Sequence, residues 1–394
     1  MKAMKYARRL DTISPFRVVE LLERAKALEA GGLNVVHLEV GEPDFPTADP
    51  IIEAGHAALA SGATKYTQAL GIPALRARIA EHYAETCGLT LAPERVVVTA
   101  GASAGLMLLS ALLLDPGDEL LLTDPGYPCN EVFVGLVNGV PVRIPLQADR
   151  GFQFGLDEVT DLWTPRTRGM LVASPANPTG AVLSRSMLAS LSSELERRGG
   201  FLILDEIYQG LVYGEDIGYG SGLEVTQEAF VLNSFSKYFG MTGWRLGWMV
   251  VPEGAIDGVA RLAQNLFISP ASISQHAALA AFEPAAMAVH EARRQAFGRR
   301  MALLADGLEQ LGFRLPARPR GAFYLYADVS GFGIDSLDFC WKLLEEYQVA
   351  ATPGIDFGNY QAARFVRFAF TTSEAQIARG LERIAEALRD WGLA

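Results

Sequence analysis

Short apolar runs alternate with helical stretches along the first three quarters of the chain. Apolar residues at helical spacing predict a helix over residues 17–30, which the pair Gly31-Gly32 would end. RVVVTAG (95–101) predicts a strand, and the apolar residues that follow it predict a buried helix. Further strands, each with polar or glycine-rich residues at its end, are predicted within the ranges 118–128, 168–180, 199–208 and 229–237.

These predicted strands are rich in Val, Ile and Leu on both faces, and helices separate them. Such strands are typical of a mostly parallel sheet that helices cover on two sides. We therefore expect an α/β fold with a mostly parallel central sheet in a large domain. Ligands bind at the carboxyl ends of the strands in such sheets. The residues at five of these ends are Gly101, Tyr127, Asn177, Asp205 and Ser236.

The pattern changes after about residue 290. Residues 291–312 predict a long amphipathic helix, and the ranges 321–329 and 364–371 alternate as half-buried strands do. We expect a large domain over residues 46–290 and a smaller α+β domain over residues 291–394. Residues 1–45 would form an N-terminal arm and part of the small domain.

Charge and composition exclude several classes of function. The 394 residues carry a formal net charge of −11, so neither nucleic acid nor an anionic membrane is expected as a partner. Three widely spaced cysteines without a CxxC motif indicate a reducing compartment, so we expect a cytoplasmic protein. We expect no metal site. The N-terminus lacks a signal-peptide core, and the longest apolar run (105–114) is too short to span a bilayer.

Lys237 lies among aromatic residues and glycines in NSFSKYFGMTGWRLGW (233–248). An ordinary surface lysine is one explanation. A partly desolvated lysine is another, because desolvation lowers the pKa and makes the amine a nucleophile suited to a Schiff base. Serine hydroxyl groups precede Lys237 in the chain and an arginine guanidinium follows it. Together these groups are suited to bind a phosphate. Together with a strand–helix junction whose free N–H groups suit an anion, the candidate phosphate ligands are Gly101, Ala102, Ser103, Ser234, Ser236 and Arg245.

Asp205 and Glu206 follow a buried strand. Since consecutive strand residues face opposite ways, one of the two carboxylates should point into the site. A buried carboxylate needs a partner, which a protonated ring nitrogen would supply; a helix cap or a salt bridge is the alternative. Asn177 and Tyr208 could bond to a ring hydroxyl, and Tyr127 could stack on a flat ring. A turn would equally explain Asn177, and core packing would explain Tyr127.

These candidates together describe a ligand with an aldehyde, a phosphate, a ring nitrogen, a ring hydroxyl and a flat face. Pyridoxal 5'-phosphate has all five features. With the motifs named below, nearly the whole chain resembles the class I/II aminotransferases, which belong to the aspartate aminotransferase superfamily of fold type I pyridoxal-phosphate enzymes. The motifs, in chain order, are VGEPDF (40–45), KYTQALGIPALR (65–76), VTAGASAGL (98–106), DPGYP (124–128), NPTG (177–180), DEIY (205–208), SFSKYFGMTGWRLGW (234–248), GAFY (321–324) and VRFAF (366–370).

The resemblance implies an aminotransferase that moves the amino group of an L-amino acid to a 2-oxo acid by a ping-pong cycle. Lys237 would hold the cofactor and carry the proton between the substrate Cα and the cofactor. Asp205 and Tyr208 would be the other catalytic residues, and Asp205 would keep the ring nitrogen protonated.

The resemblance also implies how the substrates bind. Arg367 would take the α-carboxylate by a bidentate pairing, with Gly41 and Asn177 beside it. Tyr66 would reach the phosphate in a neighbouring subunit, which implies a homodimer with shared active sites. The segments 11–16 and 352–358 would shape the pocket for the substrate side chain. Ile13, Phe16 and Phe357 would make this pocket apolar.

Two other functions fit the same residues. A β-lyase or a decarboxylase of the same fold would have an identical lysine and aspartate, so product analysis has to separate it from a transferase. A regulatory domain that senses pyridoxal phosphate would carry an added basic DNA-binding module. This acidic chain begins almost directly with the enzyme-like region, which argues against a sensor.

Overall fold

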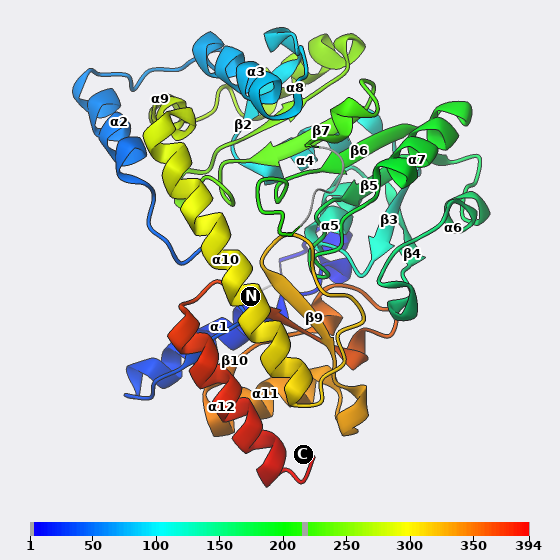
Figure 1. Cartoon of the computed structure of the whole chain (residues 1–394). Helices are drawn as coiled ribbons and strands as arrows, with labels where there is room; N and C mark the ends of the chain where they lie inside the picture. Colours follow the sequence, from blue (N-terminus) through cyan, green and yellow to red (C-terminus); the bar gives the residue numbers. More distant parts are fainter. Residues whose placement is uncertain (1–3, 215–219, 394) are drawn as a thin grey trace.

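The computed structural model describes residues 4–214 and 220–393, and a seven-stranded sheet forms its centre (Figure 1). The strand order is β2-β8-β7-β6-β5-β3-β4, and every pairing is parallel except those of β8, which is antiparallel to β2 and β7. The predicted α/β fold with a mostly parallel sheet is confirmed. The strands are β2 (Val96–Thr99), β3 (Glu119–Asp124), β4 (Val140–Pro145), β5 (Thr167–Ala173), β6 (Phe201–Asp205), β7 (Phe230–Ser234) and β8 (Gly247–Val250).

The sequence did not predict β4 and β8. β4 has a proline at its second and last positions and is partly exposed, as fits a strand at the sheet edge. β8 begins with the last two residues of the lysine-containing motif, where glycines and tryptophans gave no strand pattern. Because β8 is antiparallel to both of its neighbours, β2 runs in the same direction as β7. The carboxyl ends of β2, β5, β6 and β7 therefore lie at one edge of the sheet.

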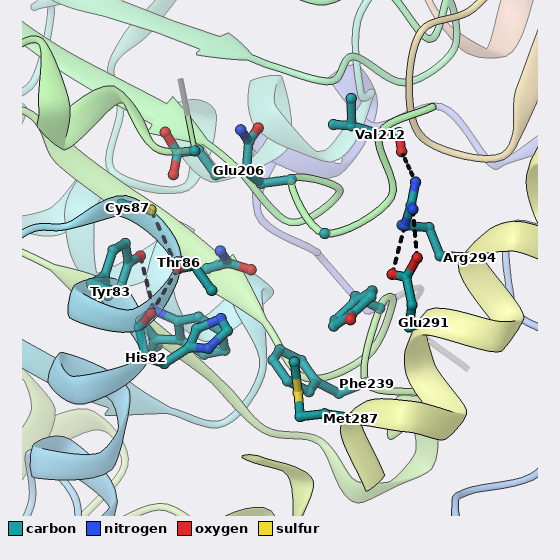
Figure 2. A pocket seen from close by; sticks show the side chains of 16 residues that line it. His82, Tyr83, Thr86, Cys87, Glu206, Val212, Phe239, Met287, Glu291 and Arg294 are labelled. Atoms are coloured by element: carbon teal, nitrogen blue, oxygen red, sulfur yellow. Dashed lines mark hydrogen bonds and ion pairs between the residues drawn. The ribbon is translucent and has the colours of Figure 1, made fainter. Parts of the chain in front are cut away.

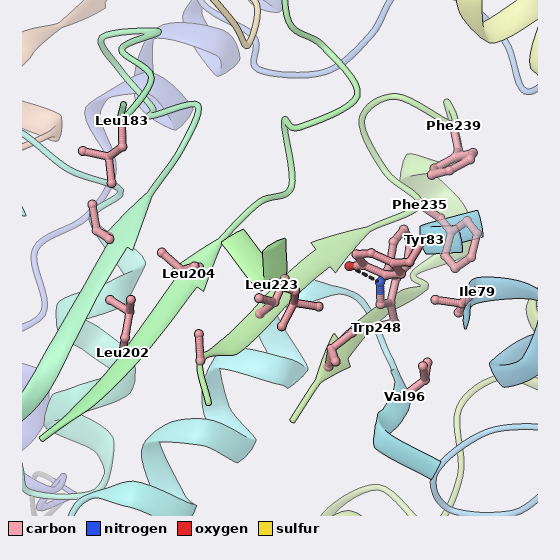
Figure 3. Packing of buried hydrophobic residues seen from close by; sticks show 14 of the residues in the cluster. Ile79, Tyr83, Val96, Leu183, Leu202, Leu204, Leu223, Phe235, Phe239 and Trp248 are labelled. Atoms are coloured by element: carbon pink, nitrogen blue, oxygen red, sulfur yellow. Dashed lines mark hydrogen bonds between the residues drawn. The ribbon is translucent and has the colours of Figure 1, made fainter. Parts of the chain in front are cut away.

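Helices cover both faces of the sheet, and strand residues alternate between two hydrophobic clusters. Leu202 and Leu204 pack into one cluster, shown in Figure 3, while Ile203 between them packs into the other. The first cluster includes residues of α2 (Asp49–Ala60), α3 (Pro73–Cys87), α6 (Leu156–Asp161), α7 (Arg185–Arg197) and α9 (Ser272–Leu279). The second includes residues of α4 (Ala102–Leu113), α5 (Cys129–Leu136) and α8 (Ile256–Leu266).

A third cluster forms the core of a smaller α+β unit, where β11-β12-β9 is an antiparallel sheet and β1 pairs with β10 in parallel. The helix predicted over residues 17–30 is confirmed as α1, and its residues Leu21, Ala25 and Leu28 lie in this cluster. The elements of the unit are α1 (Arg17–Ala30), β1 (Val36–His37), α10 (Pro284–Gln310), β9 (Tyr324–Asp328), α11 (Ser336–Tyr347), β10 (Val349–Ala350), β11 (Thr352–Pro353), β12 (Phe365–Ala369) and α12 (Glu374–Asp390).

The prediction that the strands near residues 321–329 and 364–371 are half-buried is wrong. Every residue of β9 and β12 is buried. Leu325 and Val366 pack into the third cluster, whereas Tyr326 and Phe365 pack into the first, against the central sheet. Both faces are covered because this small sheet lies between its own helices and the larger unit.

The helix ends follow local sequence signals. Proline at the first position begins α10, and the side chain of Ser373 caps α12 by accepting a hydrogen bond from the N–H of Gln376. α10 begins at Pro284, before the predicted start at residue 291, and runs between the two units (Figure 1). A domain boundary at 290/291 would fall within this helix, and the boundaries stay predictions. None of the described helices is long and apolar enough to cross a membrane.

Candidate active site

A cavity of about 360 Å³ lies where the carboxyl ends of the central strands face the smaller unit. Its size is within the range of small-molecule sites. Its walls come from segments that are far apart in the sequence, and most of the predicted site residues line it. These are Gly41, Ala102, Ser103, Tyr127, Asn177, Asp205, Tyr208, Ser234, Ser236, Lys237, Arg245 and Arg367.

Lys237 belongs to this set and lies three residues beyond the end of β7. Its Nζ donates a hydrogen bond of 2.8 Å to the backbone oxygen of Gly41, and the rings of Tyr208 and Phe323 lie 5.7 and 5.6 Å from it. Burial is the main cause that lowers the pKa of Lys237 to about 8, and the nearby guanidinium of Arg367 lowers it further. A lysine with this pKa is a better nucleophile and base near neutral pH than a surface lysine.

Gly41 lies close against the side chain of Tyr324. A Cβ atom at Gly41 would clash with Oη of Tyr324, so any other residue would require Tyr324 to shift. Tyr324 also lines the cavity, and its hydroxyl forms a 2.9 Å hydrogen bond with the hydroxyl of Tyr208. Tyr324 had no predicted role, although it ends the motif GAFY. Its contacts with Gly41 and Tyr208 join segments more than a hundred positions apart, so the motif was the available signal.

Asp205 and Glu206 point to opposite sides of the sheet, as the alternation of strand residues predicts. Asp205 lines the cavity, and its Oδ1 accepts a hydrogen bond of 3.2 Å from the N–H of Ile207. Burial raises the pKa of Asp205 to about 6, and the hydrogen bond from Ile207 and the charge of Lys237 only partly offset this rise. A cationic partner inside the cavity would return this pKa toward its ordinary value.

Arg367 lies on β12 between two aromatic rings. Its guanidinium carbon is 4.2 Å from the ring centre of Tyr324 and 4.7 Å from that of Phe357. One Nη donates to Oδ1 of Asn177 at 3.1 Å, and the other donates to the backbone oxygen of Glu39 at 2.6 Å. Nε is buried without a hydrogen-bond partner among the described residues. The rings and bonds hold the guanidinium flat at the cavity wall, with a donor left for an incoming carboxylate.

Arg245 and the start of α4 form a second cationic corner. Gly101 has φ of +80°, and a Cβ atom there would lie 2.7 Å from Nη2 of Arg245. Ala102 and Ser103 are the first residues of α4, so their backbone N–H groups have no partner within the helix. Ser234 accepts a hydrogen bond from the N–H of Ser236 at 3.0 Å. Helix N–H groups, hydroxyls and a guanidinium together suit a phosphate.

A family model described as "Aminotransferase class I and II" matches residues 34–384. The chain belongs to this family. The valine–pyruvate aminotransferase of Mycobacterium tuberculosis is 39% identical over 376 residues, which cover 95% of this chain and 97% of the relative. The aspartate/prephenate aminotransferase of Thermus thermophilus is 36% identical over 384 residues, with 97% and 98% of the two chains covered. The predicted resemblance to class I/II aminotransferases is confirmed, and the protein is an aminotransferase.

Solved structures of aminotransferases share the whole fold. A crystal structure of an aminotransferase from Mycobacterium tuberculosis matches with a TM-score of 0.95 at 38% identity, covering 98% of this chain and 100% of that chain. The aspartate aminotransferase from Thermus thermophilus with maleate matches with a TM-score of 0.92 at 36% identity and the same coverage. The aminotransferase fold thus extends over almost the complete chain.

Five predicted contributors do not line the cavity of this aminotransferase. One of them, Gly101, directly precedes the lining residues Ala102 and Ser103. Tyr66 is 86% exposed and lies outside it, so a role in a second subunit stays a prediction. Ile13, Phe16 and Phe357 are also absent from the cavity wall, although Phe357 packs on Arg367, so the apolar side-chain pocket expected from them stays a prediction. Residues of α1, one to two turns further on, line the cavity in their place: Val18, Val19 and Leu22.

A second cavity of about 270 Å³ lies on the opposite face of β6 and β7 in this aminotransferase (Figure 2). Glu206 lines it, and burial raises the pKa of this carboxyl to about 7. Its two oxygens accept hydrogen bonds from the N–H of Gly222 at 2.6 Å and from Oγ of Ser221 at 2.9 Å. On another wall, Arg294 pairs with the carboxylate of Glu291. The charged groups of this cavity thus have partners within the chain.

Proposed function

We propose that the first cavity binds pyridoxal 5'-phosphate and that the enzyme moves the amino group of an L-amino acid to a 2-oxo acid in two half-reactions. The observation that supports this most directly is the position of Lys237, whose lowered pKa leaves a reactive amine between the cationic corner at Arg245 and the guanidinium of Arg367. Asp205, buried with a raised pKa, lies in the same cavity.

The residues present fit the cofactor. The backbone N–H groups at Gly101 and Ala102 and the side chains of Ser103, Ser234, Ser236 and Arg245 would hold its phosphate. Gly101 supports this role, because any side chain there would meet Nη2 of Arg245. Asp205 would pair with the ring nitrogen, Asn177 and Tyr208 would bond to the ring hydroxyl, and Tyr127 would lie against the ring face. When bound, pyridoxal phosphate supplies an aldehyde for the amino group and a ring that accepts the electron pair left at the substrate Cα.

Lys237 would hold the cofactor at rest and, once the substrate amine replaces it, act as the base. It would take the proton from the substrate Cα and deliver it to the former aldehyde carbon, then reverse both steps for the second substrate. Asp205 would keep a proton on the ring nitrogen. Arg367 would bind the substrate α-carboxylate and so orient the Cα–H bond toward Lys237. Gly41 would leave room for that carboxylate by having no side chain.

A homodimer belongs to this proposal. The ring of Tyr66 is 86% exposed and lies away from its own cavity, which suits a residue that reaches the phosphate bound by a second copy. A cytoplasmic location is part of the same proposal and follows from the sparse cysteines.

The relatives differ in the substrates that their names state. Beside valine–pyruvate and aspartate/prephenate aminotransferases, a (5-formylfuran-3-yl)methyl phosphate transaminase of Methanocaldococcus jannaschii is 35% identical over 386 residues. Family membership therefore leaves the amino donor open, and the substrate has to be inferred from this chain's own cavity.

An absorbance spectrum of the holoenzyme, titrated with single L-amino acids and no 2-oxo acid, tests the proposal. We expect the yellow absorption to give way to that of pyridoxamine phosphate, with one 2-oxo acid released per site and no ammonia. Ammonia and pyruvate would instead indicate a β-lyase. A protein that binds no pyridoxal phosphate would contradict the proposal as a whole.

A further inference from the structure

Helix α1 presents two apolar faces, and the core of the smaller unit accounts for one of them. Leu21, Ala25 and Leu28 are buried in that core. Val18, Val19 and Leu22 lie on another face and line the cavity that holds Lys237 and Arg367. Val19 is 46% exposed, so this β-branched side chain has surface that a ligand would remove from water.

Within one described chain, the cavity wall has no spare cation for a second carboxylate. Among the described lining residues, the cationic side chains are Lys237, Arg245 and Arg367, and the proposed function uses all three. A carboxylate on the substrate side chain would lose its hydration against valine and leucine without gaining a charged partner. An aliphatic side chain would bury apolar surface there at no such cost.

The wall that α1 forms is fixed relative to Arg367. The carboxylate of Asp356 accepts hydrogen bonds from the N–H of Arg17 at 2.9 Å and from the N–H of Val18 at 2.8 Å, which holds the first turn of α1. The next residue, Phe357, packs on the guanidinium of Arg367. One short segment thus sets both the α1 wall and the carboxylate-binding arginine, and so fixes where a substrate side chain lies.

We propose that the side chain of the amino donor packs against Val18, Val19 and Leu22, and that the enzyme takes aliphatic L-amino acids in preference to aspartate and glutamate. This inference rests on the proposed function and adds the substrate class to it. It makes α1 the element that determines substrate specificity, in place of the segment before it.

The first test compares donors in the spectroscopic half-reaction of the holoenzyme. For valine, norvaline and leucine we expect kcat/KM at least about tenfold higher than for aspartate and glutamate, since each buried methylene contributes about tenfold or more. A preference for aspartate or glutamate would overturn the inference while leaving the aminotransferase intact. If no amino acid alters the spectrum, the proposed function itself fails and the inference falls with it.

The second test moves a charge into the wall. Val19→Lys should raise kcat/KM for aspartate about tenfold and lower it for valine, whereas Leu33→Lys should change neither. Leu33 is a matched control because it is also 46% exposed, comes directly after α1 and lies outside the cavity. An unchanged ratio of aspartate to valine in Val19→Lys would overturn the inference.

Binding without turnover gives an independent readout. Calorimetric titration of the holoenzyme with 3-methylbutanoate and with succinate reports the side-chain preference from analogues of valine and aspartate that lack the amino group and do not react. We expect the monocarboxylate to bind the wild type at least about tenfold more tightly, and Val19→Lys to reverse that order. Tighter binding of succinate by the wild type would contradict the proposed α1 wall.

Discussion

The two cavities share strands β6 and β7 but differ in what neutralises their buried carboxyl groups. Asp205 and Glu206 are adjacent in the chain, both are buried, and burial raises the pKa of each, to about 6 and about 7. Glu206 receives hydrogen bonds from Ser221 and Gly222, whereas the bond that the structure shows for Asp205 comes from the N–H of Ile207. A raised pKa alone therefore does not identify a functional carboxylate.

The cationic groups differ in the same way. In the second cavity Arg294 is bound by Glu291 and by the backbone oxygen of Val212 (Figure 2). In the first cavity no carboxylate of the described residues pairs with the guanidinium of Arg367, whose partners are neutral oxygen atoms of the chain. A site that awaits an anionic ligand leaves its cations without carboxylate partners, and this contrast makes the first cavity the candidate for catalysis.

Replacing Lys237 should produce the largest difference between the cavities. Lys237→Ala removes the base and the cofactor's covalent partner, so kcat should fall by about 10⁴-fold. The control is Tyr238→Phe, which alters the next residue in the chain on the side of the second cavity and should stay within about twofold of wild type. Steady-state kinetics with the preferred donor measures both. A Lys237→Ala enzyme within tenfold of wild type would contradict the role of Lys237.

Exchanging the two neighbouring acids for their amides should separate them clearly. Asp205→Asn should lower kcat by about 10²–10³-fold, because a neutral amide no longer holds a proton on the ring nitrogen. Glu206→Gln keeps an oxygen for the N–H of Gly222 and an amide for Ser221, so its kcat should stay within about twofold of wild type. Equal losses in the two variants would show that the contrast between the cavities has no catalytic meaning.

The sequence predicted most of the helices and strands, but it did not predict the contrast between the two cavities. Apolar residues on both strand faces predicted the parallel sheet, and the helix at residues 17–30 followed from its periodicity and the glycine pair. The antiparallel strand β8 was not predicted, because its glycine and tryptophan residues do not form a strand pattern. The full burial of β9 and β12 was not predicted. A sequence pattern does not show that the larger unit covers the face of the small sheet that its own helices leave open.

The candidate site shows the same limit. Sequence identified the residue types at the strand ends, and the structure brings them to one cavity. Alternation predicted that either Asp205 or Glu206 faces the site, but which of them does so depends on the helices packed on each face. Local patterns could not reveal the hydrogen bond between the hydroxyls of Tyr324 and Tyr208, nor the cavity wall formed by Val18. Both depend on contacts between segments that are distant in the sequence.

The two arginines offer a milder comparison. Arg367→Lys keeps the charge but loses the planar fork, so kcat/KM should fall by about 10²-fold, mainly through KM. Arg294→Lys should change kcat/KM by no more than about twofold, because its partners lie in the second cavity. Circular dichroism of both variants checks that the fold is intact. If Arg367→Lys kept a wild-type KM for both substrates, Arg367 would not be the carboxylate ligand.

The smallest expected effect is a change in the stability of the folded protein with pH, and it concerns Glu206 alone. Its pKa is raised above the ordinary 4.5 to about 7 by burial, so the folded protein binds more protons than the unfolded chain between these values. The contribution of Glu206 to the free energy of unfolding must therefore fall as the pH rises from about 4.5 to 7, by an amount of the order of 3 kcal/mol. Glu206→Gln removes this proton uptake. It keeps the hydrogen bond from the N–H of Gly222 and reverses the one with Ser221, whose Oγ would accept from the amide.

Thermal denaturation of the holoenzyme from pH 5 to pH 8, at a fixed excess of pyridoxal phosphate, measures this difference. The Tm of Glu206→Gln minus that of the wild type should become more positive with rising pH, because only the wild type acquires a buried charge. Leu33→Lys, a change at a residue that lines neither cavity, should show no such trend. A difference that is constant or shrinks with pH would mean that Ser221 and Gly222 stabilise the ionised carboxylate of Glu206 fully. The second cavity would then hold a permanent charge, and the distinction between the two carboxylates would lie in their partners alone.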